Sequence, residues 1–294
     1  MVRTRRLTSS QRALLAWGER ERRDLPWRRT RDPWAILVSE LMLQQTQAPR
    51  VVPKFDAFMQ RFPSASVCAS SSVGDVVDAW HGLGYNRRAV NLHRAATIVV
   101  ERHDGELPCD LDALLALPGV GPYTARAVLV FAFERDMGLV DTNAGRFIAR
   151  ALAGHAVDRA EAQHLADEAV PRGEGWAWGQ AVFDLGAAVC TKRAPACADC
   201  PIARSCAWAR AGWPEPDPVT GSAGVSRPQS RFEGSFRQGR GRVVAALRDG
   251  PIAPNDVAIV AGWPDDPARA MQALVSLVQD GLARVDESGT VCAP

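Results

Sequence analysis

Residues 117–125 read Leu-Pro-Gly-Val-Gly-Pro-Tyr-Thr-Ala, and they lead into an apolar stretch that predicts a helix over residues 122–135. Gly119 and Gly121 flank a single valine, which permits a tight turn with unblocked backbone N–H groups. Those groups, together with the positive end of the following helix, can hold a phosphate. A lone Gly-x-Gly is a weak signal, however, because it often only links two helices.

Two kinds of phosphate-holding turn can be compared with this stretch. The lysine of a nucleotide-binding P-loop is missing, and no predicted strand precedes the turn. A helix–hairpin–helix over residues 113–133 fits better, because such a motif grips the DNA backbone without reading its sequence. Tyr123 and Thr124 then stand in the first turn of its second helix.

Four of the seven cysteines fall within seventeen residues, in the spacing C-x6-C-x2-C-x5-C: Cys190, Cys197, Cys200 and Cys206. Four converging thiolates suit an iron–sulfur cluster or a tetrahedral zinc ion. The alternative is two disulfides, which require an oxidising compartment. Residues 1–7 lack the apolar core of a signal peptide, and no apolar run approaches a membrane span. We therefore expect a cytoplasmic protein with a bound metal or cluster.

The 294 residues suit two or three domains, and the composition, 47% hydrophobic and 23% charged, is that of an ordinary globular protein. A net charge of +2 does not by itself indicate a nucleic-acid partner. Residues 1–31 nevertheless hold ten arginines against three acidic residues, and a basic segment attracts phosphates. A solvated helix face with a frayed terminus explains the same pattern equally well. Lys54 and Lys192 are the only lysines.

The first 210 residues are predicted to be mostly helical. Ser9 or Ser10 is expected to cap a helix that runs to about Arg23, and Asp32-Pro33 begins a second helix with a buried apolar face. Further helices are expected near 48–61, 73–80, 86–103, 122–135, 142–152, 158–170 and 176–189. Residues 1–31 together with 139–212 are assigned to one helical domain, which contains the cysteine loop, and residues 32–138 to another.

The remaining residues change character. Prolines and small polar residues over 213–237 predict a linker. Residues 238–294 then predict a small winged-helix-like module, with helices near 239–249, 254–261 and 265–281, followed by a hairpin that pairs 282–286 with 290–293. A module of this kind could bind a DNA groove or only cap the fold, and the sequence leaves both alternatives open.

Two acidic residues and one tyrosine are candidates for chemistry. Glu40 borders the buried face of its helix, where desolvation would raise its pKa and suit a general acid, although a surface ion pair is the simpler alternative. Asp141 opens a helix, where an N-cap is the simpler interpretation, but a carboxylate there can also stabilise a cation. Tyr85 ends a glycine-hinged turn and is either a wedge into a base step or a core residue.

Together these segments resemble the helix–hairpin–helix DNA glycosylase superfamily, and within it the MutY-type adenine glycosylases. The resemblance covers about residues 10–212. Five motifs occur in the family's order: Ser-Glu40-Leu-Met-Leu-Gln-Gln-Thr-Gln, Gly82-Leu-Gly-Tyr85, the hairpin from Leu117 to Ala125, Asp141-Thr-Asn143, and the four-cysteine spacing. The resemblance implies a mainly α, two-lobed fold and a [4Fe–4S] cluster rather than zinc.

The resemblance also implies a mechanism. An adenine mispaired with 8-oxoguanine or guanine is flipped out of double-stranded DNA, and Glu40 protonates it. Asp141 stabilises the resulting oxocarbenium ion, and Glu40 then activates water, as paired carboxylates do in retaining glycosidases. Tyr123 matches a tyrosine that touches the catalytic pocket. DNA or base contacts are implied for further residues: Gln44, Gln45, Tyr85, Gly119, Gly121, Thr124, Asn143, Arg146 and Gln180.

The missing lysine separates two subclasses. Endonuclease III-type relatives place a nucleophilic lysine where Tyr123 stands, and neither Lys54 nor Lys192 matches that position. The resemblance therefore implies a monofunctional glycosylase without efficient strand cleavage, acting as a monomer in the nucleoid. Only 88 residues follow Cys206, which indicates a short form without the Nudix-like domain that many MutY-type proteins carry.

Two other functions compete with this interpretation. A mismatch thymine glycosylase shares the tyrosine at position 123 and also lacks a Nudix-like domain, although the run Gln44-Gln45-Thr46-Gln47 favours adenine. A non-catalytic, cluster-bearing DNA-binding regulator is the more distant alternative, and it would require Glu40 and Asp141 to be incidental.

Overall fold

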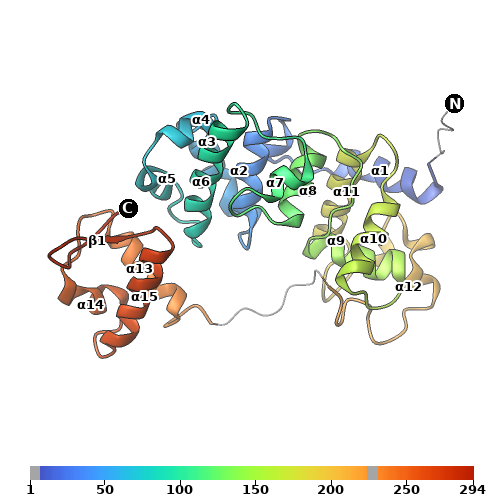
Figure 1. Cartoon of the computed structure of the whole chain (residues 1–294). Coiled ribbons are helices and arrows are strands. Elements are labelled where there is room, and N and C mark those ends of the chain that lie inside the picture. Colours follow the sequence, from blue (N-terminus) through green and yellow to red (C-terminus); the bar gives the residue numbers. More distant parts are fainter. Residues whose placement is uncertain (1–6, 224–230) are drawn as a thin grey trace. The chain divides into compact units, whose positions relative to one another are not determined.

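The computed structural model describes residues 7–223 and 231–294, and within them the fold is almost entirely helical (Figure 1). The chain divides into two compact units. The first unit takes the described residues up to Ile36, Cys109–Leu115 and those from Gly121 to Ala223. The second unit takes Leu37–Pro108, Ala116–Val120 and the described residues from position 231 onward.

The first unit is built around a central helix, α11 (Gly175–Ala188), which packs against α1 (Ser9–Glu21) and α9 (Thr142–Phe147). At Gly186 of α11, a Cβ would lie 2.6 Å from the backbone oxygen of Asn143, so only glycine allows this approach of α9. The unit also contains several further elements: α7 (Leu111–Leu115), α8 (Pro122–Phe131), a π-helical turn (Ile148–Ala153), α10 (Arg159–Ala169) and α12 (Ala207–Arg210).

The N-cap of the first helix lies before both residues that were predicted to cap it, Ser9 and Ser10. Thr8 is the N-cap, because its hydroxyl accepts from the Gln11 amide at 3.2 Å while the Gln11 side chain accepts from the Thr8 amide at 2.9 Å. This reciprocal capping box outcompetes Ser9 and Ser10, which lie inside the helix. The helix ends at Glu21 rather than near Arg23, because Arg22 leaves the helical backbone conformation. Arg3, Arg5 and Arg6 of the predicted basic segment lie outside the described residues.

The helical part of the second unit contains the end of α2 (Pro33–Leu43) and four more helices: α3 (Ala48–Arg61), α4 (Ala65–Ser70), α5 (Val73–Ala79) and α6 (Arg87–Arg102). Its core is formed by fully buried residues such as Leu41, Phe58 and Trp80, with the rings of Phe58 and Trp80 edge-to-face at 5.9 Å. The short helices α4 and α12 were not predicted, since two residues or fewer of each are buried and no apolar period is visible.

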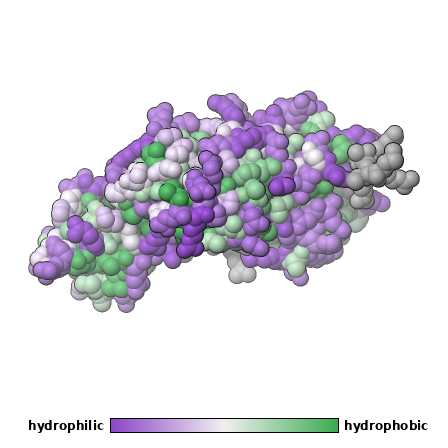
Figure 2. Space-filling view, turned by 45° about the horizontal axis from the view of Figure 1, so that its top comes forward, coloured by the Kyte–Doolittle hydropathy of each residue, from purple (hydrophilic) through white to green (hydrophobic). Residues whose placement is uncertain are grey.

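The C-terminal residues of the second unit fold as three helices and a two-stranded ribbon: α13 (Phe236–Ala246), α14 (Val257–Ala261), α15 (Pro267–Gln279), β1 (Arg284–Val285) and β2 (Val291–Cys292). We call these residues, 236–294, the C-terminal module. The exposed face of α15 is apolar, because Met271, Val275 and Val278 are all exposed. Green areas at the left end of Figure 2 show the apolar surface of this part of the chain.

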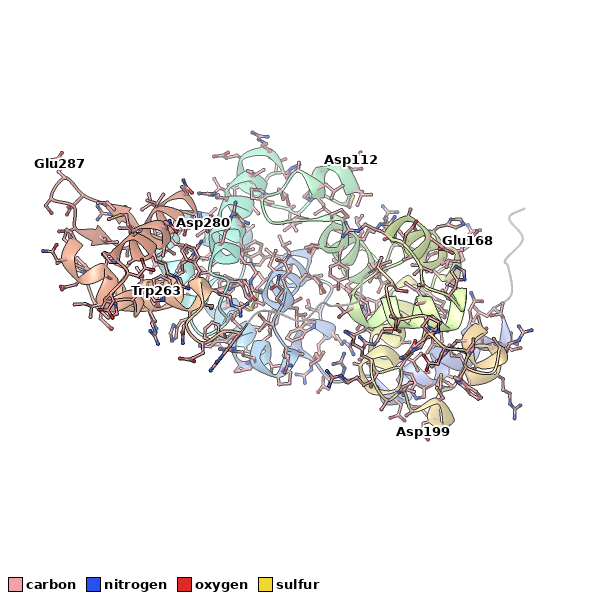
Figure 3. The ribbon with its side chains drawn as sticks, turned by 90° about the horizontal axis from the view of Figure 1, so that it is seen from below. Asp112, Glu168, Asp199, Trp263, Asp280 and Glu287 are labelled. Atoms are coloured by element: carbon pink, nitrogen blue, oxygen red, sulfur yellow. The ribbon has the colours of Figure 1, made fainter. Side chains whose placement is uncertain are left out.

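The C-terminal module packs against α5 and α6. Val90 of α6 belongs to the module's own hydrophobic core, beside residues such as Val243 and Val291. Asp280, labelled in Figure 3, pairs with Arg240 at 2.5 Å and with Arg87 of α6 at 3.4 Å. The module is therefore a docked part of the second unit.

The segment predicted as a linker is folded over its first half. Asp217 pairs with Arg150 at 2.5 Å, and the Ser222 hydroxyl accepts from the Val157 amide at 3.1 Å. Residues 213–223 therefore belong to the first unit, whereas residues 224–230 of the predicted linker lie outside the described part of the chain. Among the helices of 7–223 and 231–294, none has the length and apolarity needed to cross a membrane.

Candidate active site

Glu40 lies in α2, a helix that is apolar all round and therefore buried. The helix starts at Pro33 as predicted, and the Asp32 carboxylate accepts from the Trp34 amide at 3.0 Å. The Glu40 residue is only 5% exposed, and its neighbours Ser39 and Leu41 are fully buried. The carboxyl is thus not on a solvent-facing helix surface, and the surface ion pair considered for it does not fit.

Arg88 organises the residues that follow Glu40. Its guanidinium is buried and donates to the carbonyl oxygens of Leu41, Met42 and Gln44 at 2.6–2.8 Å. These carbonyls end α2 and would otherwise lack helical donors. A further bond, to the carbonyl of Gly84 at 2.9 Å, joins the end of α2 to the turn 82–85. Burial lowers the pKa of Arg88 to about 10, so the side chain stays charged at neutral pH.

Two predicted DNA-contact residues have backbone conformations that residues other than glycine rarely adopt. Gln45 has φ 56° and Tyr85 has φ 49°, both in the left-handed region. Such conformations are held by their surroundings and occur often at functional sites. Here the surroundings include Arg88, whose guanidinium carbon lies 5.5 Å from the centre of the Tyr85 ring.

The hairpin turn lies beside the end of α2 in the second unit. The Gln44 side chain donates to the Gly119 carbonyl at 3.4 Å. Gly119 has φ +80°, and a Cβ there would lie 2.9 Å from the Cβ of Asn91, so the turn requires glycine. Gly121 is different: its φ is −94° and nothing lies within 4 Å of the Cβ position. Only one of the two predicted glycines is thus required by the backbone.

The second helix of the hairpin motif is α8, in the first unit. It carries Tyr123 and Thr124 in its first turn, as predicted. Thr124 is buried, whereas Tyr123 is half-buried with its ring centre 6.4 Å from that of Phe183 on α11. The Tyr123 ring therefore forms part of the aromatic packing on α11.

Asp141 is the N-cap of α9. One carboxylate oxygen accepts from the backbone amides of Asn143 at 2.9 Å and Ala144 at 2.6 Å. The other accepts from the Asn143 side chain at 3.0 Å. Burial raises the pKa of Asp141, and these three hydrogen bonds together with the charge of Arg146 oppose the increase. The N-cap interpretation is confirmed, and it fixes the carboxylate in one orientation.

Arg146 connects this cap to the cysteine loop. Its guanidinium donates to the Asn143 side-chain oxygen at 2.7 Å and to the backbone oxygen of Cys190 at 2.9 Å. A continuous chain of hydrogen bonds therefore runs within the first unit from Cys190 through Arg146 and Asn143 to Asp141.

The four cysteines of the loop line one cavity whose walls are otherwise mainly apolar. All four are free thiols, so the two disulfides considered for them are not formed. Burial raises the pKa of the Cys200 thiol to about 11, and it also raises the pKa of Cys190 and Cys206. Thiolates at these positions therefore need bound cations to offset their desolvation. Arg150, whose guanidinium lies 3.5 Å from the Cys190 sulfur, adds one positive charge.

Known DNA repair proteins resemble this chain in sequence. Residues 38–172 match the HhH-GPD superfamily of base excision DNA repair proteins. The adenine DNA glycosylase of Mycolicibacterium smegmatis is 41% identical over 280 residues, which cover 94% of this chain and 93% of that protein. The chain belongs to the adenine DNA glycosylase family.

Two solved structures resemble the fold. A thermostable thymine-DNA glycosylase superposes with a TM-score of 0.63 at 30% identity, over 68% of this chain and 94% of that one. A trapped endonuclease III–DNA covalent intermediate superposes with a TM-score of 0.59 at 22% identity, over 71% and 100%. The second likeness concerns the fold alone. The predicted mainly α, helix–hairpin–helix glycosylase fold is confirmed.

Sequence reasoning missed one buried ion pair in this member of the adenine DNA glycosylase family. Asp184 of α11 is fully buried and accepts from Arg28 at 2.7 and 3.0 Å, and from the Arg23 side chain at 2.6 Å. Burial by itself would raise the pKa of Asp184, but the hydrogen bonds from Arg28 and Arg23 hold it below 3.8. One signal was available: Asp184 is the only acidic residue in the apolar stretch 176–189, just as Glu40 is in its own helix.

Gln180 of α11 is buried and lines a concave surface that α11 shares with α1. Charged residues such as Arg12, Glu19 and Arg22 line the same surface beside apolar ones such as Leu15 and Ala177. In the first unit Gln180 thus borders a surface that residues of α1 also line.

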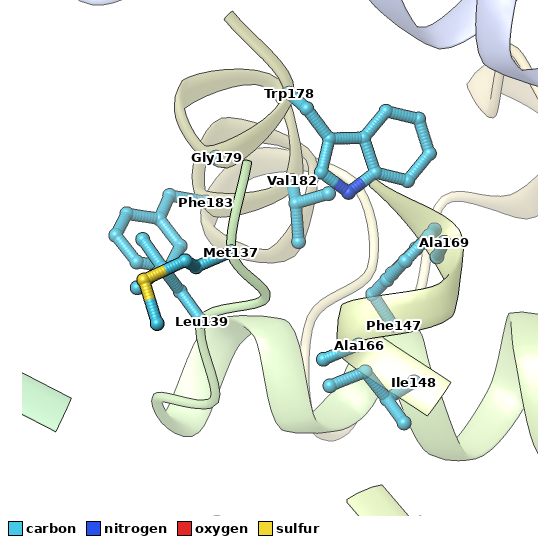
Figure 4. A pocket seen from close by; sticks show the side chains of 10 residues that line it. All are labelled: Met137, Leu139, Phe147, Ile148, Ala166, Ala169, Trp178, Gly179, Val182 and Phe183. Atoms are coloured by element: carbon cyan, nitrogen blue, oxygen red, sulfur yellow. The ribbon is translucent and has the colours of Figure 1, made fainter. Parts of the chain in front are cut away.

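The pocket shown in Figure 4 is a different feature of the first unit. Its lining is almost wholly apolar, with Phe147, Trp178 and Phe183 as the largest side chains, and no carboxylate contributes to it. A flipped base needs hydrogen-bonding partners at its edge, which this pocket does not supply. We assign it to the hydrophobic core beneath α11.

Proposed function

We propose that this member of the adenine DNA glycosylase family is monofunctional and hydrolyses the N-glycosidic bond of adenine opposite 8-oxoguanine or guanine in double-stranded DNA. The observation that carries the proposal is the buried carboxyl of Glu40 in an apolar helix. A carboxyl in a site withdrawn from water is suited to proton transfer as a general acid. The family relationship supplies the reaction class.

In the proposed reaction, Glu40 donates its proton to a ring nitrogen of the flipped adenine. The bond between the adenine nitrogen and the sugar carbon then breaks, and the bonding electrons leave with the base. Asp141 in its carboxylate form, oriented by its three donors, stabilises the positive charge on the sugar. Glu40 finally takes a proton from water as the oxygen of that water bonds to the sugar carbon, so the products are free adenine and an abasic site.

We propose that Tyr123 touches the same catalytic pocket, and that it stands where a Schiff-base lysine would be needed for strand cleavage. The chain offers only Lys54 and Lys192 as alternatives. Lys54 lies on α3 in the second unit, and Lys192 lies in the cysteine loop. Neither lies on α8 beside Tyr123, which supports a monofunctional enzyme.

The cysteine loop is proposed to hold a [4Fe–4S] cluster through Cys190, Cys197, Cys200 and Cys206. Within the described residues, no three Cys, His, Asp or Glu side chains come together in a group that could hold one ion, although all four sulfurs line one cavity. The family relationship favours a cluster, in which each thiolate binds a different iron, over one tetrahedral zinc ion. When bound, the cluster supplies a structural cross-link for the loop.

The DNA contacts are proposed to involve backbone and side-chain donors from both units. In the second unit these are Gln44, Gln45, Tyr85 and Gly119; in the first unit they are Gly121, Thr124, Asn143, Arg146 and Gln180. Lys192, Arg193 and Arg204 of the cysteine loop supply additional charge for phosphates. We further propose that the protein acts as a monomer at the nucleoid.

The C-terminal module is proposed to be winged-helix-like, on the order of its three helices and its ribbon. Its helix α15 exposes an apolar face, which does not suit a phosphate-rich groove. Two roles were left open for the module, binding a DNA groove or capping the fold. The apolar face argues against a role in which α15 reads a groove.

A panel of defined duplexes tests the proposed function. Purified protein is incubated with adenine opposite 8-oxoguanine, adenine opposite guanine, and thymine opposite guanine, and the released base is identified. Release of adenine from the first two duplexes, without efficient borohydride trapping on DNA, is the expected result. Release of thymine alone would instead favour the mismatch thymine glycosylase, which the 30% identical structure keeps as the second candidate.

A further inference from the structure

The C-terminal module places an arginine on the turn that carries Tyr85. Arg237, in the first turn of α13, donates to the Tyr85 hydroxyl at 2.7 Å. Its guanidinium carbon also lies 5.5 Å from the centre of the Tyr85 ring, the same distance as that of Arg88. Two guanidinium groups, one from α6 and one from α13, therefore hold a single tyrosine whose backbone is in the left-handed region.

The position of Arg237 does not depend on this one bond. Val90 of α6 lies in the core of the C-terminal module, and Arg248 of the module pairs with Asp78 at 2.6 Å. Arg87 of α6 pairs with Asp280 of the module at 3.4 Å. The docking thus fixes α13 beside the turn 82–85, and Arg237 is presented to Tyr85 by a supported helix.

A second aromatic ring accompanies this arginine. Phe232 is 54% exposed, and its ring centre lies 5.2 Å from the guanidinium carbon of Arg237. An exposed aromatic ring, a cation and a half-buried tyrosine together form the kind of surface on which unstacked bases are held. Arg237 and Phe232 therefore add a cation and an exposed aromatic ring to the turn that carries Tyr85.

We propose that Arg237 is a specificity-determining residue for the base opposite the target adenine, and that it acts through Tyr85. This inference rests on the proposed function. A charged donor on the phenol oxygen polarises the hydroxyl and makes it a stronger hydrogen-bond donor. 8-Oxoguanine carries a second carbonyl oxygen that guanine lacks, so a strengthened donor at this position favours 8-oxoguanine over guanine.

The first measurement is single-turnover adenine release from duplexes that differ only in the opposite base. Arg237→Gln removes the charge but keeps a polar side chain of moderate length. It is expected to lower the ratio of the 8-oxoguanine rate to the guanine rate about tenfold, the size of one charge-assisted hydrogen bond. Tyr85→Phe is expected to lower the ratio to a similar extent. The double variant should lose no more than either single one, because both changes remove the same interaction.

Two control variants separate this effect from undocking of the module. Arg248→Gln breaks the ion pair with Asp78 but leaves Arg237 in place, so the ratio should stay unchanged. Arg237→Lys keeps the charge with a shorter reach and should give an intermediate ratio. Protection of the C-terminal module from limited proteolysis is compared across all variants, and equal protection shows that docking is retained. If Arg237→Gln alone loses protection, the rates of Arg237→Lys are used instead. An intermediate ratio of the 8-oxoguanine rate to the guanine rate supports the inference, and an unchanged ratio overturns it.

A binding measurement makes the outcome independent of catalysis. Each variant is titrated with duplexes that carry a tetrahydrofuran abasic analogue opposite 8-oxoguanine or guanine. A fall in the affinity ratio for Arg237→Gln supports the inference even if no adenine is released, a result that would sink only the proposed function. Equal losses on both duplexes, an unchanged ratio, or additive effects of the Arg237 and Tyr85 changes would overturn the inference.

Discussion

Arg146 ties Asn143 to the cysteine loop: its guanidinium donates to the Asn143 side-chain oxygen at 2.7 Å and to the Cys190 carbonyl at 2.9 Å. Asn143 in turn donates to the Asp141 carboxylate at 3.0 Å. The orientation of a proposed catalytic carboxylate therefore depends on the same loop that supplies the four cysteines.

Loss of the Arg146 guanidinium should affect both ends of this chain of bonds. Arg146→Gln leaves the Asn143 side chain and the Cys190 carbonyl without their charged donor, so Asp141 is less firmly placed. We expect adenine release to fall by about 10- to 100-fold, the scale of a small misplacement of a catalytic group. The visible absorbance per protein should decrease as well. Arg159→Gln, an exposed change in the same unit, is the matched control, and full activity in Arg146→Gln would contradict the account.

The pH dependence of base release should report Asp141. Because burial raises the pKa of this carboxyl, the ionised form is lost at a higher pH than for an ordinary aspartate, whose pKa is 3.8. Activity that needs the carboxylate therefore falls as the pH decreases through this raised value. Asn143→Ala removes one donor to the carboxylate and should move the acidic limb to still higher pH. Single-turnover rates over an acidic-to-neutral series measure the limb, and a shift to lower pH would be inconsistent with the geometry.

The ion pair between Asp184 and Arg28 should be a major contribution to folding stability. Asp184→Asn leaves the buried Arg28 without its charged partner, and we expect a loss of about 3–5 kcal/mol in the free energy of unfolding. The pKa of Asp184 is held below 3.8 in the folded state, so its contribution is present above that pH and is lost as the pH falls through the lower folded value. Urea unfolding at neutral and acidic pH measures both effects.

The control for this prediction is the exposed pair of Asp24 and Arg29. Asp24→Asn should change the unfolding midpoint little, because solvent screens an exposed ion pair. Comparable losses in Asp24→Asn and Asp184→Asn would show that burial of Asp184 does not determine the effect.

The two hairpin glycines should respond differently to alanine. Gly119→Ala places a Cβ 2.9 Å from that of Asn91 at a φ of +80°, so we expect destabilisation of about 1–3 kcal/mol. Gly121→Ala meets nothing within 4 Å at a φ of −94° and should be neutral or stabilising by about 0.4–1 kcal/mol. Thermal unfolding of the two variants side by side checks the difference, and equal midpoints would argue against it.

The sequence predicted the features that depend on neighbouring residues. The start of α2 at Asp32-Pro33 and the cap at Asp141 follow from local chemistry, and both are present. The Thr8 capping box is also local, but the sequence analysis assigned the cap to Ser9 or Ser10 instead. The pairs Arg28–Asp184 and Arg237–Tyr85 join residues more than 150 positions apart, so no local pattern encodes them. The same is true of Arg88, because its role depends on the folded structure, in which it donates to the carbonyls of both Gln44 and Gly84.

The central claim is that the buried Glu40 carboxyl supplies the proton that releases adenine. Glu40→Gln keeps the shape of the side chain and removes the acid, and Glu168→Gln, at an exposed position, is the control. Single-turnover adenine release and duplex binding are measured on the same preparations. The account predicts that Glu40→Gln abolishes release while binding is retained and Glu168→Gln behaves as the unchanged protein; undiminished release by Glu40→Gln would contradict it.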